Sequence, residues 1–274
     1  MKNIFIFPLC AYIGLVFLAQ TVWAEEPVTA SEKSAEILLL EKKAHSGDLA
    51  AQSELGFAYL FGGQVQQNAT LAKQWLTEPA KSGDAPAQTA LGYIYEEGLV
   101  GTQNLEKAIS WYQKAVEQDH PVAQSRLGYI YKSRQDALRD YAAAAQLLER
   151  AAAWGDEYAQ ANLADMYEQG LGVEKDLAKA ATWYSAAASQ NHLIAQRRMG
   201  HFYEHGLGVE QDYVKAYMWY SIAGVWDSVD PDQVPEGDPR HGLQNKMAPD
   251  DVTKAKNLAT DWWSEHFMQD EALP

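Results

Sequence analysis

Apolar and polar residues recur along most of this chain with a period of 36 residues. A glutamine marks each period, and the five copies are Gln52, Gln88, Gln124, Gln160 and Gln196. An alanine always precedes the glutamine, a leucine or methionine follows three residues later, and a tyrosine stands seven residues after it. Five copies in register, without an insertion, predict a stack of similar structural units.

Each repeat has the pattern of two amphipathic helices joined by a short loop. In the fourth copy Ala159, Leu163 and Tyr167 follow at four-residue intervals, which places them on one helix face. The glycine-rich segment 170–173 predicts the end of this helix. A second helix then has apolar residues at the helical spacing i, i+3, i+4 and i+7, namely Ala180, Trp183, Tyr184 and Ala187.

Residues suited to capping stand before the predicted helices. Asp156 precedes the first helix of the fourth repeat. Every second helix is preceded by Asn or Asp, at Asn68, Asn104, Asp140, Asp176 and Asp212. Their side-chain oxygens can accept free N–H groups of a first helical turn. The pattern predicts repeats over 47–82, 83–118, 119–154, 155–190 and 191–226.

Both ends of the array predict capping elements, which repeat proteins need in order to cover the outermost core residues. Residues 25–46 predict an N-terminal capping helix, with its helical pattern from Ser31 to Ser46. Residues 227–274 predict a loop up to residue 240, a short helix over 242–247 and a C-terminal capping helix. Pro249 suits the first position of this last helix.

The repeat motif resembles the Sel-one-like repeat family, which is related to the tetratricopeptide repeats. The shared pattern is A-Q-x-x-L-G-x-x-Y-x-x-G-x-G-V-x-x-D-x-x-K-A-x-x-W-Y. The fourth repeat matches it at Gly170, Gly172, Val173, Asp176, Lys179, Ala180, Trp183 and Tyr184, and the fifth at Gly206, Gly208, Val209, Asp212, Lys215, Ala216, Trp219 and Tyr220. The third repeat departs most, with residues 133–136 in place of the glycine loop. The resemblance implies an all-α fold, a right-handed α-solenoid of tandem helix-turn-helix repeats with terminal capping helices.

A helical wheel predicts which side of each first helix stays exposed. If each repeat starts at position zero, a turn of about 100° per residue centres the apolar stripe near roughly 110°. Position ten lies almost opposite and holds Phe57, Tyr93, Tyr129, Asp165 and His201. Position fourteen adds Phe61 and His205, and Arg197 ends a row of small residues at position six.

These side chains predict a binding groove on the concave side that the resemblance implies. Its N-terminal half would be aromatic, and its C-terminal half would be polar and carry histidines. Exposed aromatic side chains often anchor protein interfaces. The small residues at position six, such as Ser53 and Thr89, would leave room for a bound segment. The alternative, in which the aromatic residues pack between neighbouring hairpins, stays open.

Residues 201–205 match H-x-x-E-H, an inverted zinc-protease signature. However, Tyr203 occupies the repeat's own tyrosine position, and no third metal ligand is recognisable. No nucleophile stands in a recognisable pattern with a general base, and the single cysteine is Cys10. We therefore predict no metal site, no catalytic residue and no cofactor.

The first 24 residues have the layout of a secretory signal peptide, with Lys2, an apolar run over 4–18 and Ala24 before an acidic segment. The run is shorter than the roughly 20 residues of a spanning helix, which favours cleavage over an uncleaved anchor. Cleavage predicts a periplasmic or secreted protein without membrane insertion.

The charge of the chain bears on its partners. Lys2 is the only charged residue before Glu25, so the mature charge is 22 − 1 − 37 = −16 with neutral histidines. This charge repels phosphate backbones, and we expect no nucleic-acid binding.

We expect an exported scaffold that binds another protein or peptide. The alternative is a peptidoglycan- or glycan-binding protein, or a β-lactam-binding protein with hydrolase activity. Exported cysteine-rich relatives are associated with penicillin binding, but they carry a disulfide in each repeat, and this chain has a single cysteine.

Overall fold

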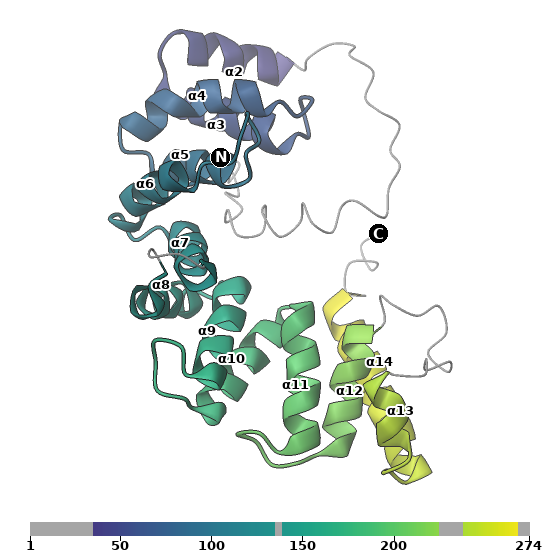
Figure 1. Ribbon diagram of the computed structural model, residues 1–274. Helices are drawn as coiled ribbons and strands as arrows, with labels where there is room; N and C mark the ends of the chain where they lie inside the picture. The colour runs from purple at the N-terminus through teal and green to yellow at the C-terminus, as the bar shows by residue number, and fades with distance from the viewer. Residues whose placement is uncertain (1–34, 135–138, 225–237, 268–274) are drawn as a thin grey trace. The chain divides into compact units, whose positions relative to one another are not determined.

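The computed structural model describes residues 35–134, 139–224 and 238–267 (Figure 1). These residues contain helices and connecting loops but no strand. The helices are α2 (Ala35–His45), α3 (Leu49–Phe61), α4 (Ala69–Lys81), α5 (Ala85–Glu96), α6 (Leu105–Val116), α7 (Pro121–Ser133), α8 (Tyr141–Ala153), α9 (Glu157–Gln169), α10 (Leu177–Ser189), α11 (Leu193–His205), α12 (Tyr213–Gly224), α13 (Pro239–Gln244) and α14 (Pro249–Phe267). The predicted signal peptide lies outside the described residues.

The chain divides into two compact units, Met1–Leu127 and Gly128–Pro274, with the boundary inside α7. In the first unit, each helix from α2 to α6 packs on the next one along the chain. In the second unit, the helices from α8 to α12 do the same, and α13 and α14 both pack on α12. This consecutive pairing confirms the predicted all-α solenoid of tandem helix-turn-helix repeats. The first helices of the repeats are α3, α5, α7, α9 and α11.

The residues predicted to cap the second helices do so. Each accepts a backbone N–H of the first helical turn, as in the 2.8 Å bond from the Lys107 amide to Asn104 and the 2.9 Å bond from the Ala143 amide to Asp140. Each cap residue also donates its own N–H to the carbonyl of the repeat's tyrosine. These cap–tyrosine bonds measure 2.8 to 3.1 Å and join Asn68 to Tyr59, Asn104 to Tyr95, Asp140 to Tyr131, Asp176 to Tyr167 and Asp212 to Tyr203. The same bond therefore closes the loop between the two helices of each repeat.

The recurring glutamine joins four of the repeats to the helix before them. The side-chain amide of Gln88 donates to the carbonyl of Ala80 at 2.9 Å, near the end of α4. Gln52, Gln160 and Gln196 make the equivalent bond to Ala44, Ala152 and Ala188. The last carbonyls of a helix have no partner within its regular ladder. The Ala80 carbonyl accepts the Gly83 amide of the turn at 3.3 Å, and the glutamine adds a second donor from the next repeat.

Two kinds of glycine allow the helices and loops to approach closely. On Gly92 in α5, a Cβ atom would lie 2.5 Å from the ring of Tyr112 in α6. Gly172, in the loop before α10, has a φ of 69°, and a Cβ there would lie 2.2 Å from the carbonyl oxygen of Tyr141. Gly208 stands in the same relation to Leu177. The loop glycines thus pack against the start of the preceding second helix.

Helices lie in both of the segments that flank the repeats. Helix α2 lies within the predicted 31–46 segment, and α14 begins at Pro249. The short helix predicted over 242–247 is wrong in its position, since α13 begins at Pro239. Asp238 accepts the amide of Arg240 at 2.8 Å, and proline suits the first helical position, so this cap and proline set the start. None of the described helices is both long and apolar enough to cross a membrane.

Candidate functional site

The position-ten residues of the first unit are aromatic and half-buried. Phe57 in α3 and Tyr93 in α5 pack against the core of this unit while part of each ring remains accessible. Phe57 stacks on Phe61, with ring centroids 6.3 Å apart and planes 4° from parallel. The guanidinium of Arg126 lies over the Tyr93 ring at 5.1 Å. These rings contribute to the core and also form part of the surface.

In the second unit the residues predicted for the binding groove are more polar. Tyr129 in α7 is 47% exposed. Asp165 in α9 forms a 2.5 Å ion pair with Lys132. His201 in α11 is half-buried, and its ring lies 4.3 Å from that of the exposed His205. Arg197, the remaining residue predicted for the site, is exposed on the same helix.

Two exposed apolar residues extend this stripe and were missed by the sequence analysis. Tyr158 in α9 and Ile194 in α11 occupy position three of their repeats and are 44% and 64% exposed. At about 100° per residue, position three lies only about 20° from position ten. The same helical wheel could therefore have included them. We call positions three and ten of the first helices the first-helix stripe.

The small residues at position six do not line an open surface. Ser53, Thr89, Ser125 and Ala161 are all buried. Thr89, for example, contacts the ring nitrogen Nδ1 of His120 at 3.0 Å. These positions therefore contribute to packing, and the room predicted beside the stripe is filled.

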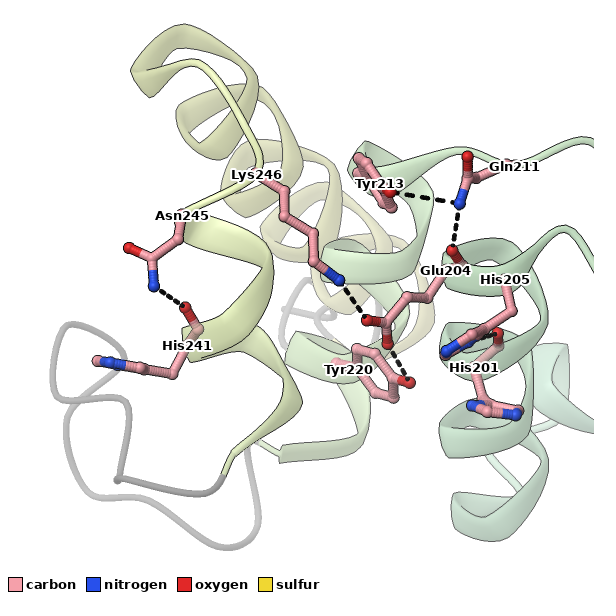
Figure 2. Close-up of polar contacts among 9 residues, drawn as sticks. All are labelled: His201, Glu204, His205, Gln211, Tyr213, Tyr220, His241, Asn245 and Lys246. Atoms are coloured by element: carbon pink, nitrogen blue, oxygen red, sulfur yellow. Dashed lines mark hydrogen bonds and ion pairs between the residues drawn. The ribbon is translucent and has the colours of Figure 1, made fainter.

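Three glutamates each link two repeats, or a repeat and the C-terminal cap. The hydroxyl of Tyr112 donates to Glu96 at 2.6 Å, and Arg126 of the next repeat lies 3.6 Å from the same carboxylate. Glu168 is held in the same way by Tyr184 and Arg198. Glu204 accepts from Tyr220 and from Lys246, each at 3.2 Å (Figure 2). We call these three contacts the Tyr–Glu–cation links.

The electrostatics of the links follow from their burial. Burial raises the pKa of Glu96, against the lowering effects of the Arg126 charge and the Tyr112 hydrogen bond. Burial, with the charge of Glu96, also holds the pKa of Tyr112 well above its usual value. The pKa of Tyr184 is raised by burial and by the charge of Asp165. The tyrosine hydroxyls therefore stay protonated and remain hydrogen-bond donors at neutral pH.

The glutamate of the H-x-x-E-H segment makes contacts that belong to the repeat array. Figure 2 shows the Glu204 carboxylate between Tyr220 and Lys246, where it serves a Tyr–Glu–cation link. Burial, followed by the charges of His205 and Arg198, lowers the pKa of His201. Within the described parts of the chain, no group of three or more His, Cys, Asp or Glu side chains is placed to hold a metal ion.

A surface cavity of about 380 Å³ lies beside the loop of the fourth repeat. Its lining residues are Tyr167, Val173, Glu174, Lys175, Asp176 and Lys179. Lys179 lies over the Tyr167 ring at 5.1 Å, and Asp176 caps α10. Side chains of the repeat motif thus form this cavity, and they are engaged in contacts within the repeat.

These repeated bonds define a helical-repeat scaffold, a class of protein that presents a row of helix faces to a partner. The Sel1 repeat family model matches residues 49–84, 85–120, 121–156, 157–192 and 193–224. The chain therefore belongs to the Sel1 repeat family. Members of this family generally act as non-catalytic scaffolds that bind other proteins.

Solved structures with the same repeat are similar to this chain. A Sel1 repeat protein from Oxalobacter formigenes is 29% identical, with a TM-score of 0.62 over 87% of this chain and 98% of its own. The structure of c5321, described as a protective antigen present in uropathogenic Escherichia coli strains displaying an SLR fold, is 28% identical with a TM-score of 0.58. That match covers 85% of this chain but only 57% of c5321. A search of curated proteins finds no match.

Proposed function

We propose that this protein is an exported scaffold that binds another protein or peptide through the first-helix stripe. The observation that carries the proposal is the placement of exposed apolar side chains in the second unit. Tyr129, Tyr158 and Ile194 are each between 44% and 64% exposed, and all three belong to the stripe. Large apolar side chains that remain accessible on one face are typical of protein-binding surfaces.

The stripe of the first unit supports the same proposal with different chemistry. Phe57 and Tyr93 of the stripe, and Phe61 stacked on Phe57, offer partly accessible rings, and Arg126 lies above the ring of Tyr93. Aromatic and arginine side chains are enriched at the energetic centres of interfaces. The C-terminal first helices add Asp165, Arg197, His201 and His205, which could select the partner through polar contacts.

Export is the part of the proposal that rests on sequence alone. Residues 1–24 have the layout of a cleaved leader. Fractionation of cells that produce the full chain, together with the N-terminal sequence of the product, tests this directly. A product that starts at Met1 in the cytoplasm would contradict export.

Binding is tested by crosslinking the purified chain to envelope proteins and identifying the captured partner. We then expect the triple variant Phe57→Ala, Tyr93→Ala, Tyr129→Ala to lose capture, because it removes the aromatic part of the stripe. The double variant Tyr158→Ala, Ile194→Ala tests the residues that the structure adds.

Trp154→Ala is the control, since Trp154 is 71% exposed but lies in the turn after α8, outside the helix positions that define the stripe. Helix content from circular dichroism should be unchanged in every variant. Capture that survives both stripe variants, or that is lost equally in Trp154→Ala, would contradict the use of the stripe.

A further inference from the structure

His201 and His205 stand four residues apart near the end of α11, on one face of the helix. Their ring centroids are 4.3 Å apart, and their planes are tilted by 44°. Two imidazoles at this spacing can direct ring nitrogens to a common point beside the helix. This is the spacing that helical zinc motifs use for two of their ligands.

The hydrogen bonding of His205 favours a ligand role. Its Nδ1 atom lies 3.1 Å from the backbone carbonyl oxygen of His201, and a carbonyl can only accept. Nδ1 therefore carries the proton, which leaves the lone pair of Nε2 free. A backbone carbonyl that holds the second ring nitrogen in this way is the usual support of a metal-binding histidine.

The surroundings leave the pair open. His205 is exposed and His201 is partly so. The intervening Glu204 is engaged by Tyr220 and Lys246, and Arg198 is paired with Glu168 (Figure 2). Neither the Glu204 carboxylate nor the Arg198 guanidinium is therefore free to pair with the two histidine rings. Since no cluster of three ligands exists among the described residues, water or a docked partner would complete the coordination.

We propose that His201 and His205 form an open two-histidine site for a late first-row divalent metal ion. Imidazole ligands suit copper, nickel and zinc, and the general order of affinity places copper(II) first. The site shares His201 and His205 with the proposed partner-binding surface, but binding of the metal ion does not require the partner. A bound ion there would offer vacant coordination positions to a histidine or carboxylate of a partner.

The test is a titration of the purified chain, without a polyhistidine tag, with copper(II) and then with zinc(II). We expect one saturable copper(II) equivalent in calorimetry and two nitrogen ligands in the electron paramagnetic resonance spectrum. His201→Ala and His205→Ala should each weaken binding by roughly tenfold or more, the size of loss seen when a metal site is disturbed.

His241→Ala is the matched control, because this histidine lies on α13 and should leave the titration unchanged. Circular dichroism should show the same helix content for all variants. The proposal is overturned if the wild-type chain shows no saturable binding, or if the His201→Ala, His205→Ala double variant binds like the wild type. The titration contains no partner protein, so its failure is separate from any failure of the proposed scaffold role.

Discussion

The hydroxyl of Tyr112 donates a 2.6 Å hydrogen bond to the carboxylate of Glu96, and both side chains are buried between α5 and α6. The first repeat has Leu76 and Leu60 at the same two places. Tyrosine thus occurs together with glutamate, whereas leucine occurs with leucine in the first repeat and with Lys132 in the third, where Leu148 takes the tyrosine position. The two pairs are alternative ways to fill one site without leaving a buried polar group unsatisfied.

This pairing predicts strong coupling between the two residues. Glu96→Leu removes the acceptor of the fully buried Tyr112 hydroxyl, which should lower the free energy of unfolding by roughly 1–3 kcal/mol. The double variant Glu96→Leu, Tyr112→Leu restores the pair of the first repeat and should lose less than the two single variants combined. Urea unfolding measures each value. Additive losses would show that the two side chains act independently.

We predict that a side chain at Gly172 destabilises the protein by a steric clash, in addition to the cost of the positive φ at this position. Gly172→Ala places a Cβ 2.2 Å from the carbonyl oxygen of Tyr141, in a backbone with a φ of 69°. Gly155 has a φ of 93° but nothing within 4 Å of its Cβ position. We expect Gly155→Ala to cost about 1 kcal/mol and Gly172→Ala to cost about 1–3 kcal/mol more. Equal melting temperatures of the two variants would contradict the close contact.

We predict that His192 caps α11 in a pH-dependent way. Its Nδ1 accepts the Ala195 amide at 3.2 Å, where the second repeat uses Asp84 for the equivalent bond. Burial lowers the pKa of His192 below 6.5, so the unfolded chain binds more protons than the folded chain just below that pH. The stability that neutral His192 contributes is therefore present above about pH 6.5 and is lost as the pH falls through this window.

Replacing the cap tests this window. His192→Asn keeps a neutral acceptor that does not titrate in the same range, so its stability advantage over the wild type should grow as the pH falls from about 7 to about 5. His192→Asp serves as a second variant with the cap that other repeats use. Thermal unfolding at several pH values gives the comparison. A constant difference between wild type and His192→Asn would exclude a titrating cap.

We predict that the hydrogen bond from Gln88 to the Ala80 carbonyl contributes more to stability than the bond from the exposed Gln118 to Gln88. Gln88→Leu leaves the Ala80 carbonyl without this donor, which should cost about 1–2 kcal/mol. The side chain of Gln118 donates to Gln88 at 2.9 Å but is itself exposed. Gln118→Leu should therefore change stability by less than about 0.5 kcal/mol. Urea unfolding measures the loss for each variant. A larger loss for Gln118→Leu than for Gln88→Leu would contradict a role for the bond to Ala80.

Local rules predicted the helices and their starts well. Asp156 accepts the Ala159 amide at 2.7 Å, and the five predicted caps of the second helices hold. A capping bond joins residues two or three apart, so its geometry depends on the nearby sequence alone. The repeat supplied the same evidence five times, which is why the pairing of helices could also be predicted.

The burial of the first helices was harder to predict. Ile94, Ile130, Met166 and Phe202 at position eleven are buried, although the predicted apolar stripe did not include them. A helical wheel treats one helix with one buried side, whereas a first helix within an array has neighbours on more than one side. The buried arc is therefore wider than the stripe, and it also covers the small residues at position six.

The Tyr–Glu–cation links were invisible to the single-repeat pattern. The Arg126–Glu96 contact joins residues 30 apart, and it appears only when two repeats are stacked. A comparison of the repeats with one another would have provided a signal, because glutamate accompanies tyrosine in the second, fourth and fifth copies.

The cap–tyrosine bond also has a consequence for protein engineering. The third repeat lacks the glycine loop, yet the Asp140 amide still donates to the Tyr131 carbonyl at 3.1 Å. The start of the second helix is thus fixed by its two anchor residues, whatever sequence connects them. The connection of the third repeat, which lacks the closely packed loop glycine, is therefore the natural place to graft a foreign epitope or a protease site, since such an insert would begin and end at a bond that the array already makes.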